Sequence, residues 1–274
     1  MLRVFEFMVG TLGRLFNLSL RIGKHNGEDI FRYPENKWNL IPFPSSKGVV
    51  FNSDNLATVN RHSFIVETRF AKALYMAESR WLKSSDEVRD ISWRLHTFIW
   101  AVGVALRSHG TDAIFVECGT GKGYMAAGAA SYYNFEDSGP DFYLVDVFQN
   151  SLVSKDGIES ISPAEFAYTD NVDEVKKYFD RFPSIKVIKG LIPPVLSNIP
   201  NKPISFLHID LNNSDAEEGA LQSLKNRLCS GSVILFDDYG GFGGSCQAIV
   251  HQRFAKDNNR ELLVLPTGQA VIIW

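Results

Sequence analysis

The stretch from residue 114 to residue 125 restricts the fold of this chain more than any other part of the sequence. It reads Ile-Phe-Val-Glu-Cys-Gly-Thr-Gly-Lys-Gly-Tyr-Met and begins with an apolar run without alternation, which is typical of a buried parallel strand. Gly119, Gly121 and Gly123 then allow the backbone to turn tightly and leave no side chain between it and a ligand. The Ala-rich segment 124–133 predicts a helix whose N-terminal amides face this loop. A strand, a glycine loop and a helix in this order predict a nucleotide-type binding site.

The spacing of the glycines separates the known nucleotide-binding motifs. A dinucleotide fingerprint requires G-x-G-x-x-G, and here the third glycine comes one residue early. A P-loop is excluded because Val116 and Gly123 stand where it requires a glycine and a Ser or Thr. The remaining pattern, an acid at Glu117 followed by alternating glycines, resembles motif I of class I S-adenosylmethionine (SAM) methyltransferases. A plain glycine-rich turn is the simpler interpretation of the glycines alone, but the flanking strand and helix favour a binding site.

After this motif the pattern alternates between strands and helices. Apolar runs predict six further strands, at 142–146, 185–188, 204–210, 232–236, 261–265 and 270–274. Helices are expected between them, at 163–182, 215–228 and 246–255. With the strand at 114–116 this is an α/β fold, a Rossmann-like, mostly parallel sheet of seven strands. Such doubly wound sheets bind their ligands at the carboxyl ends of the strands.

Two more positions complete the expected cofactor site. Asp146 ends the strand 142–146 at about the distance from the glycine loop where nucleotide-binding units place a carboxylate for ribose hydroxyls. A surface aspartate without a ligand is the alternative, but the position favours ribose binding. Gly190 follows the strand 185–188, near where the adenine should lie. The expected cofactor-binding residues are Glu117, Gly119, Gly121, Gly123, Asp146 and Gly190.

Three aspartates form a second group of candidate site residues. Asp210 ends the strand 204–210, and Asp237 and Asp238 follow the strand 232–236. Two neighbouring strands would bring these carboxylates together, and a divalent cation would relieve their mutual repulsion. An all-oxygen site suits Mg²⁺, with Mn²⁺ or Ca²⁺ as alternatives. The sequence Asp-Asp-Tyr-Gly is also good turn chemistry, but acids at the ends of two strands favour a metal site.

Several motifs together resemble a narrower family, the macrocin O-methyltransferases. The resemblance rests on the segments 93–97, 117–123, 208–212 and 237–240, and it extends over roughly residues 62–274. Members of this family are SAM- and Mg²⁺-dependent O-methyltransferases that act on sugar or phenolic hydroxyls of natural products. The resemblance implies that Asp210, Asp237 and Asp238 are metal ligands, and that Glu117, Gly119 and Asp146 contact SAM.

The chemistry of methyl transfer gives these groups their roles. Transfer is an in-line displacement by a substrate oxygen on the sulfonium methyl, so the enzyme must orient both partners and help to remove a proton. A cation held by the three aspartates, with Asp210 as the catalytic ligand, would bind the acceptor hydroxyl and lower its pKa. The expected partner is therefore a hydroxylated small molecule.

The sequence departs from this family at the position of the general base. Some members carry an acid or a His shortly after the first metal-binding Asp, whereas this chain has Asn212 and Asn213. An amide orients a hydroxyl but does not accept its proton at neutral pH. His62, His96 or Tyr239 could serve instead, metal activation could suffice, or the activity could be lost or changed; we expect His208 to be a buried support.

These departures leave several functions open. One alternative is a SAM methyltransferase without a metal, in which the aspartates bind the substrate directly. Another is a SAM-binding or structural protein without catalysis, motivated by Asn212 and Asn213. An NAD-linked oxidoreductase is more distant, because the glycine spacing disagrees with it.

Composition excludes some partners and suggests a compartment. A net charge of -3 offers no overall attraction to nucleic acid. Three cysteines, odd in number and without metal-ligand spacing, indicate reduced thiols in a cytoplasmic protein. No apolar run reaches membrane-spanning length.

The N-terminal part is expected to be separate from the methyltransferase domain. Apolar residues recur there at helical spacing, at positions 5, 8, 9, 12, 15 and 16. This helix would pack on its own domain or on a second subunit of a homo-oligomer; lying on a membrane surface is the less favoured alternative. Residues 24–60 look irregular and would form an arm or lid. We therefore expect two parts, 1–60 and 61–274, the second beginning with helices at 64–81 and 85–108.

Overall fold

The computed structural model describes residues 51–54, 56–58, 60, 63–81, 90–148, 172–240 and 245–274, together with the backbone of strands 21–25 and 28–32. The chain divides into two compact units. One comprises Met1–Ile65 with Arg89–Ile91, and the other comprises Val66–Val88 with Ser92–Trp274.

The strands described in the first unit form two short antiparallel hairpins. Strand β1 (Arg21–His25) pairs with β2 (Glu28–Arg32), and β3 (Phe51–Ser53) pairs with β4 (Leu56–Thr58). The expectation of an irregular stretch at 24–60 was therefore wrong at these strands. Their short, polar sequences lack the alternation that marks a strand, although the Asn-Gly dipeptide after β1 is typical of a hairpin connection. The helix expected near residues 5–16 lies outside the described residues.

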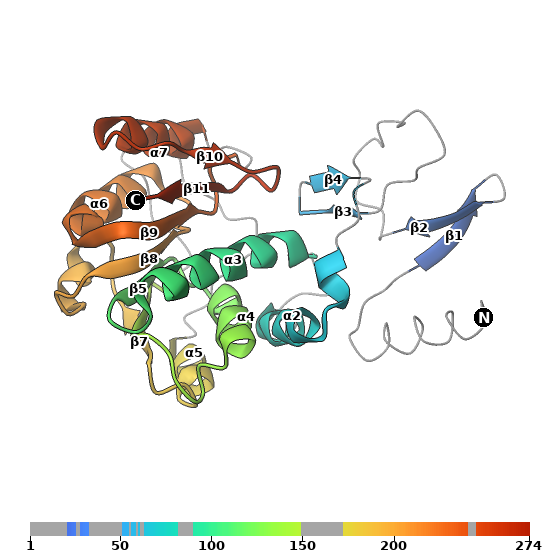
Figure 1. The fold of residues 1–274 in the computed structure, drawn as a ribbon, viewed down its shortest axis with the longest axis horizontal. Helices are drawn as coiled ribbons and strands as arrows, with labels where there is room; N and C mark the ends of the chain where they lie inside the picture. Colours follow the sequence, from blue (N-terminus) through green and yellow to red (C-terminus); the bar gives the residue numbers. More distant parts are fainter. Residues whose placement is uncertain are drawn as a thin grey trace. The chain divides into compact units, whose positions relative to one another are not determined.

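The second unit is built on one seven-stranded sheet (Figure 1), which confirms the predicted fold class. The strand order is β10-β11-β9-β8-β5-β6-β7, with parallel pairing from β9 to β7 and antiparallel pairing of β11 with β9 and of β10 with β11. The strands are β5 (Ile114–Cys118), β6 (Phe142–Asp146), β7 (Ile185–Lys189), β8 (Ile204–Ile209), β9 (Leu228–Phe236), β10 (Leu263–Val264) and β11 (Ala270–Ile273).

Helices cover both faces of this sheet (Figure 1). The α-helices are α2 (Thr68–Trp81), α3 (Ser92–His109), α4 (Tyr124–Tyr133), α5 (Val172–Phe179), α6 (Ser214–Leu224) and α7 (Ser245–Asp257). This unit also contains two short 3-10 helices, η3 (Pro194–Asn198) and η4 (Lys225–Arg227), and a further one, η1 (Ser63–Val66), lies at the boundary between the two units in the sequence. The predicted starts of the helices at 85–108 and 163–182 lie in segments outside the described residues.

The central strands are buried on both faces, and their side chains divide between two cores. Successive residues of a strand point to opposite faces of the sheet. On one face, Leu207 and Ile234 belong to a buried apolar cluster that includes Leu221 of α6 and Val250 of α7. On the other face, the ring of Phe98 in α3 lies 5.1 Å from that of Phe206 in β8, measured between centroids. Burial on both sides explains why these strands read as apolar runs without alternation.

Strand β9 begins earlier than predicted. Its first half was not predicted because Cys229 to Ser232 are a polar run, in which Gly231 has a positive φ of 83°. The preceding helix is correspondingly shorter, because α6 ends at Leu224 and η4 follows it. Edge strand β10 is also shorter than the predicted 261–265.

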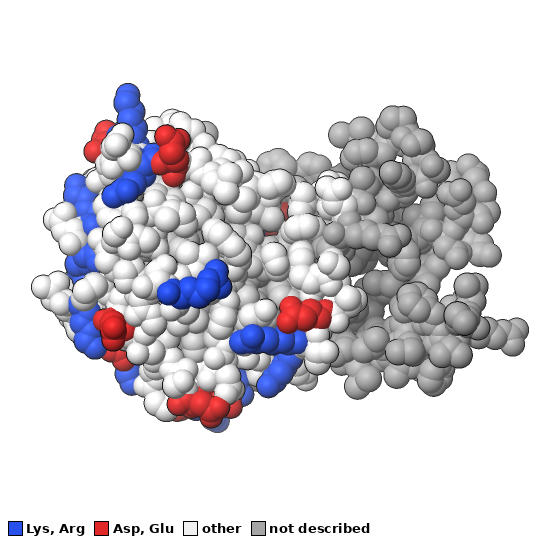
Figure 2. Space-filling model, viewed as in Figure 1, with Lys and Arg blue, Asp and Glu red and all other residues white. Residues whose placement is uncertain are grey.

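The described surface carries both signs of charge. On the face shown in Figure 2, basic and acidic side chains are interspersed among the described residues. No helix in the described part of the chain combines the length and the apolar character that crossing a membrane requires.

Candidate active site

The glycine loop is shaped by close contacts inside the protein. Gly119, Gly121 and Gly123 all have positive φ, at 93°, 52° and 77°. A Cβ on Gly119 would lie 1.7 Å from the carbonyl oxygen of Asp210, and a Cβ on Gly123 would lie 2.5 Å from the ring of Phe179. Both positions therefore require glycine because of their backbone conformation and their neighbours. The main chain of the loop consequently packs directly against the first residue of the acidic group.

Asp146 binds the glycine loop to the end of strand β6. Its Oδ2 accepts the N–H of Gly121 at 2.8 Å, and its Oδ1 accepts the N–H of Phe148 at 2.7 Å. Burial raises the pKa of this carboxyl, while the backbone donors from Phe148 and Gly121 oppose the shift. Gly190 lies beside it, since its N–H donates to the carbonyl of Asp146 at 2.9 Å. The structure thus brings Gly121, Asp146 and Gly190 together, as their positions in the sequence predict.

Glu117 is enclosed by the protein. Its carboxyl is only 2% exposed; Oε2 accepts the hydroxyl of Thr120 at 2.8 Å, and Oε1 lies 3.0 Å from Nδ1 of His208. Both oxygens therefore have partners within the protein. Glu117 braces the loop against strand β8, and direct contact with SAM stays a prediction.

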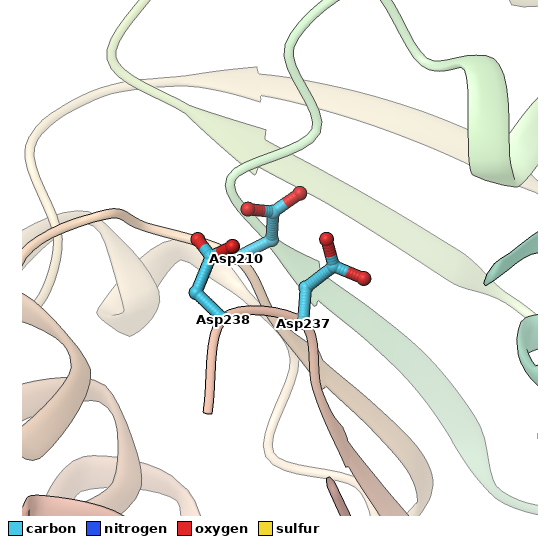
Figure 3. A group of neighbouring side chains, drawn as sticks. All are labelled: Asp210, Asp237 and Asp238. Carbon is cyan, nitrogen blue, oxygen red and sulfur yellow. The ribbon is translucent and has the colours of Figure 1, made fainter. Parts of the chain in front are cut away.

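The three aspartates form one cluster at the ends of two neighbouring strands (Figure 3). Asp210 follows β8, and Asp237 and Asp238 follow β9, where the parallel register places Ile209 beside Phe236. Each contributes a carboxylate oxygen to a group whose atoms all lie within 4.8 Å of one another. The sequence predicted this grouping, and the geometry agrees with it.

The carboxyls of the cluster have very different proton affinities. Burial and then the neighbouring Asp237 and Asp238 raise the pKa of Asp210 well above its usual range. Burial and the charge of Asp237 raise the pKa of Asp238 to about 7. Burial acts in the same direction on Asp237, but Arg94 and His208 outweigh it and hold its pKa well below the ordinary value. Without a cation, Asp237 is therefore the carboxyl of the cluster that ionises most readily, whereas Asp210 and Asp238 take up a proton more readily than an ordinary aspartate.

Two side chains that the sequence did not single out hold Asp237. Arg94 of α3 donates from Nη1 to Oδ2 of Asp237 at 2.6 Å, and Gln269 donates from Nε2 to Oδ1 at 2.8 Å. Arg94 lies in the expected helix 85–108 and in the segment 93–97 that contributes to the family resemblance, but no role at the site was expected for it. The sequence could have indicated this role, because Arg94 lies between the apolar positions Ile91 and Leu95 of the helix and a buried arginine is almost always paired with an acid.

His208 is the buried support that the sequence predicted. It is fully buried, and its ring lies between Glu117 and Asp237, with Nε2 3.7 Å from Oδ1 of Asp237. Burial lowers the pKa of His208, but its contacts with Asp237 and Glu117 outweigh this and raise it to about 10. The chain of contacts from Thr120 through Glu117 and His208 to Asp237 links the glycine loop to the acidic cluster.

The candidates for the general base are not equally placed. Asn213 accepts the N–H of Ala216 at 2.9 Å and so caps helix α6. Asn212 has a positive φ of 52°, and its amide lies 3.5 Å from Oδ1 of Asp210. Tyr239 accepts a hydrogen bond from Gln252 at 2.6 Å, His96 packs at the edge of Phe70, and His62 lies outside the described residues. The two asparagines thus serve structure and orientation, and neither accepts a proton.

The acidic cluster fits a divalent cation. Oδ2 of Asp238 is buried and has no hydrogen-bond partner among the described residues. An unsatisfied buried carboxylate oxygen is costly, and a cation coordinated by several carboxylates removes that cost. The donor set is entirely oxygen, which suits Mg²⁺ or a similar hard ion.

Comparison with known proteins agrees with this geometry. Residues 116–239, which include the glycine loop and all three aspartates, match the family model described as a methyltransferase domain. The chain carries a SAM-dependent methyltransferase domain. A search of curated protein sequences finds no match.

Solved structures show the same fold for this methyltransferase. The O-methyltransferase NovP is 18% identical, with a TM-score of 0.54 over 66% of this chain and 78% of that one. The calicheamicin methyltransferase CalS11 is 15% identical, with a TM-score of 0.53 over 76% of this chain and 93% of its own. A second structure of CalS11, without ligand and described as a TDP-rhamnose 3'-O-methyltransferase, has a TM-score of 0.50 at 15% identity, over 76% of this chain and 95% of that one.

Proposed function

We propose that this protein transfers a methyl group from SAM to a hydroxyl of a small acceptor, with a divalent cation, Mg²⁺, held by Asp210, Asp237 and Asp238. The observation that carries the proposal is the acidic cluster beside the glycine loop, with carboxylate atoms within 4.8 Å of one another. The buried, unpartnered oxygen of Asp238 supports it, since among the described residues nothing else satisfies that atom.

The residues of the chain support both halves of such a reaction. The glycine loop and Asp146 would bind and orient the cofactor, and the aspartates would orient the acceptor. Because the main chain of Gly119 packs on the carbonyl of Asp210, the two half-sites are in direct contact. Holding two reactants side by side is itself a large part of catalysis. When bound, a divalent cation would supply Lewis acidity that lowers the pKa of an acceptor hydroxyl.

We propose a sugar or phenolic hydroxyl of a natural product as the acceptor. Support comes from the resemblance to macrocin O-methyltransferases and from the fold neighbours, of which CalS11 is described as an enzyme in calicheamicin biosynthesis. Asn212, whose amide lies beside Asp210, is able to orient such a hydroxyl.

The first test is calorimetric titration with SAM and with Mg²⁺ on the wild type and on Asp238→Asn, which keeps the shape of the side chain. We expect SAM to bind to both proteins and Mg²⁺ to bind to the wild type only. Asp215→Asn, an exposed acid of α6, is the matched control and should bind both ligands as the wild type does. Absence of SAM binding in folded wild type would contradict the central claim; a wild type that binds SAM and then methylates a hydroxylated acceptor would complete it.

A metal-independent methyltransferase is the second candidate, and the ion pair between Arg94 and Asp237 favours it. This pair already compensates one of the three negative charges of the cluster. In that case the remaining aspartates would bind the acceptor directly. Methyl transfer that persists unchanged in excess chelator would support this function and exclude the metal-dependent one.

A further inference from the structure

The three aspartates of the cluster are not equivalent. Asp237 is 5% exposed, and both of its carboxylate oxygens accept hydrogen bonds, from Arg94 and from Gln269. Asp238 has an oxygen without a partner among the described residues, and the amide of Asn212 reaches Asp210 only at 3.5 Å. One carboxylate is therefore held by donors of other side chains before any ion arrives, whereas Asp210 and Asp238 lie against each other.

The guanidinium of Arg94 donates hydrogen bonds both to the side chain and to the main chain of Asp237. Nη1 donates to Oδ2 at 2.6 Å and to the carbonyl oxygen of the same residue at 2.9 Å, and Nη2 donates to the carbonyl of Thr267 at 3.2 Å. A guanidinium presents its donors in a rigid, planar fork. Because Arg94 contacts both the carboxylate and the carbonyl oxygen of Asp237, it fixes the side-chain rotamer of Asp237 relative to the backbone.

A second contact fixes the other oxygen of Asp237. Gln269, which is fully buried, donates from Nε2 to Oδ1, and its own Oε1 accepts the hydroxyl of Thr267 at 3.0 Å. That hydroxyl sets the orientation of the amide, since it places the oxygen of the amide away from Asp237. Thr267 and Gln269 come from the turn before β11, and Arg94 comes from α3, so two distant segments converge on one carboxylate.

We propose that Arg94, assisted by Gln269, is a positioning residue for the divalent ion of this site. The inference rests on the proposed function. Arg94 holds the Asp237 carboxylate in one orientation, so that the ion meets one rigid ligand and two adjustable ones. Groups that orient metal ligands in this way set the affinity for the metal, although they do not touch it.

A different role for Arg94 makes the opposite prediction. If Arg94 acts only as a counter-charge, a lysine at this position preserves its effect. Removal of the charge would then strengthen binding of a cation, because a nearby positive charge repels it. A positioning role instead requires both guanidinium nitrogens, Nη1 on Asp237 and Nη2 on the carbonyl of Thr267, and the single ammonium of lysine does not replace this planar pair.

The test is binding of Mn²⁺, followed by the loss of the electron paramagnetic resonance signal of the free ion. We expect Arg94→Lys and Arg94→Met both to weaken binding by about 10- to 100-fold. Arg107→Lys, on the exposed end of the same helix, should leave binding unchanged. Unchanged binding by Arg94→Lys, or tighter binding by Arg94→Met, would overturn the inference.

A second variant covers the case in which the arginine variants do not fold. Gln269→Met removes one donor to Asp237 and roughly conserves volume; we expect binding to be weaker by about 10-fold. Gln222→Met, on the exposed face of α6, is its control. SAM affinity and circular dichroism report separately on the fold. A folded Gln269→Met variant with wild-type Mn²⁺ affinity overturns the inference alone, whereas a wild type that binds SAM but no Mn²⁺ overturns it together with the metal part of the proposed function.

Discussion

Single residues carry most of the constraint at this site, and Gly119 is the clearest example. Its φ of 93° is unfavourable for any residue with a Cβ, and that atom would lie 1.7 Å from the carbonyl oxygen of Asp210. We expect Gly119→Ala to lower the free energy of unfolding by about 3 kcal/mol, the sum of backbone strain and overpacking. Urea denaturation measures this change.

Gly110 provides the matched control for Gly119. It also has a positive φ, 56°, but a Cβ there would meet no atom within 4 Å. Gly110→Ala should therefore lower the free energy of unfolding only by the cost of the backbone strain, about 1 kcal/mol. Equal losses for the two variants would show that contact between the loop and Asp210 contributes nothing to stability.

His96, a candidate base from the sequence, gives a prediction on pH. Burial lowers its pKa, and the charge of Glu67 opposes this only in part. The unfolded chain therefore binds a proton more readily, and the contribution of His96 to stability is present above the unfolded pKa of about 6.5 and is lost as the pH falls below it. Nuclear magnetic resonance titration should find its pKa below 6.5, and His96→Gln should flatten the stability profile in this range. A titration at or above 6.5 would contradict the expected burial.

At the scale of elements, helix α2 connects the glycine loop to α5 through one side chain. Arg80 donates from Nε to the carbonyl of Lys122 at 3.0 Å, and its guanidinium lies 4.2 Å from the centre of the Tyr178 ring. We expect Arg80→Met to lower the free energy of unfolding by about 2 kcal/mol, from the lost hydrogen bond and the lost cation–π contact. It should also weaken SAM binding, because the loop loses a support.

Arg181 separates these two contributions. Its guanidinium also stacks on Tyr178, at 4.5 Å, but its side chain is 40% exposed, and its hydrogen bond and ion pair go to Tyr178 and Glu136. Arg181→Met should cost less than about 1 kcal/mol and leave SAM affinity unchanged. If both variants weaken SAM binding equally, the ring of Tyr178 and not the contact with Lys122 supports the loop.

The elements of the sheet were predictable because their chemistry is local. Helix α4 and strand β6 have the predicted bounds, since apolar runs and glycines mark them directly. The start of β9 was missed because Cys229 to Ser232 lack apolar character. They lie in a register shift between two pairs with β8, Leu228 with Ile204 and Val233 with Phe206, and the N–H of Gly231 donates to the carbonyl of Trp274. Arg94 escaped prediction as a site residue for a similar reason: its partner lies 143 residues away, and only the packing of α3 on the sheet brings them together.

At the scale of the whole molecule, every candidate site residue that the structure describes belongs to one unit. The glycine loop, Asp146, Gly190 and the acidic cluster all lie between residues 117 and 238, within the unit formed by Val66–Val88 and Ser92–Trp274. The sequence predicted this concentration, because the strand ends of a doubly wound sheet converge at one edge. The role of residues 1–60 is a hypothesis that needs a separate experiment.

Removal of residues 1–60 tests whether the methyltransferase unit is independent. A unit with its own sheet and two cores is expected to fold alone, so the shortened chain should bind SAM within about twofold of the full chain. If residues 1–60 form a lid or a subunit contact, the same truncation should impair acceptor methylation or lower the mass measured by light scattering. Unchanged methylation and unchanged mass would contradict both hypotheses, the lid and the subunit contact. Loss of SAM binding from a folded truncated chain would instead show that the N-terminal unit supports the cofactor loop.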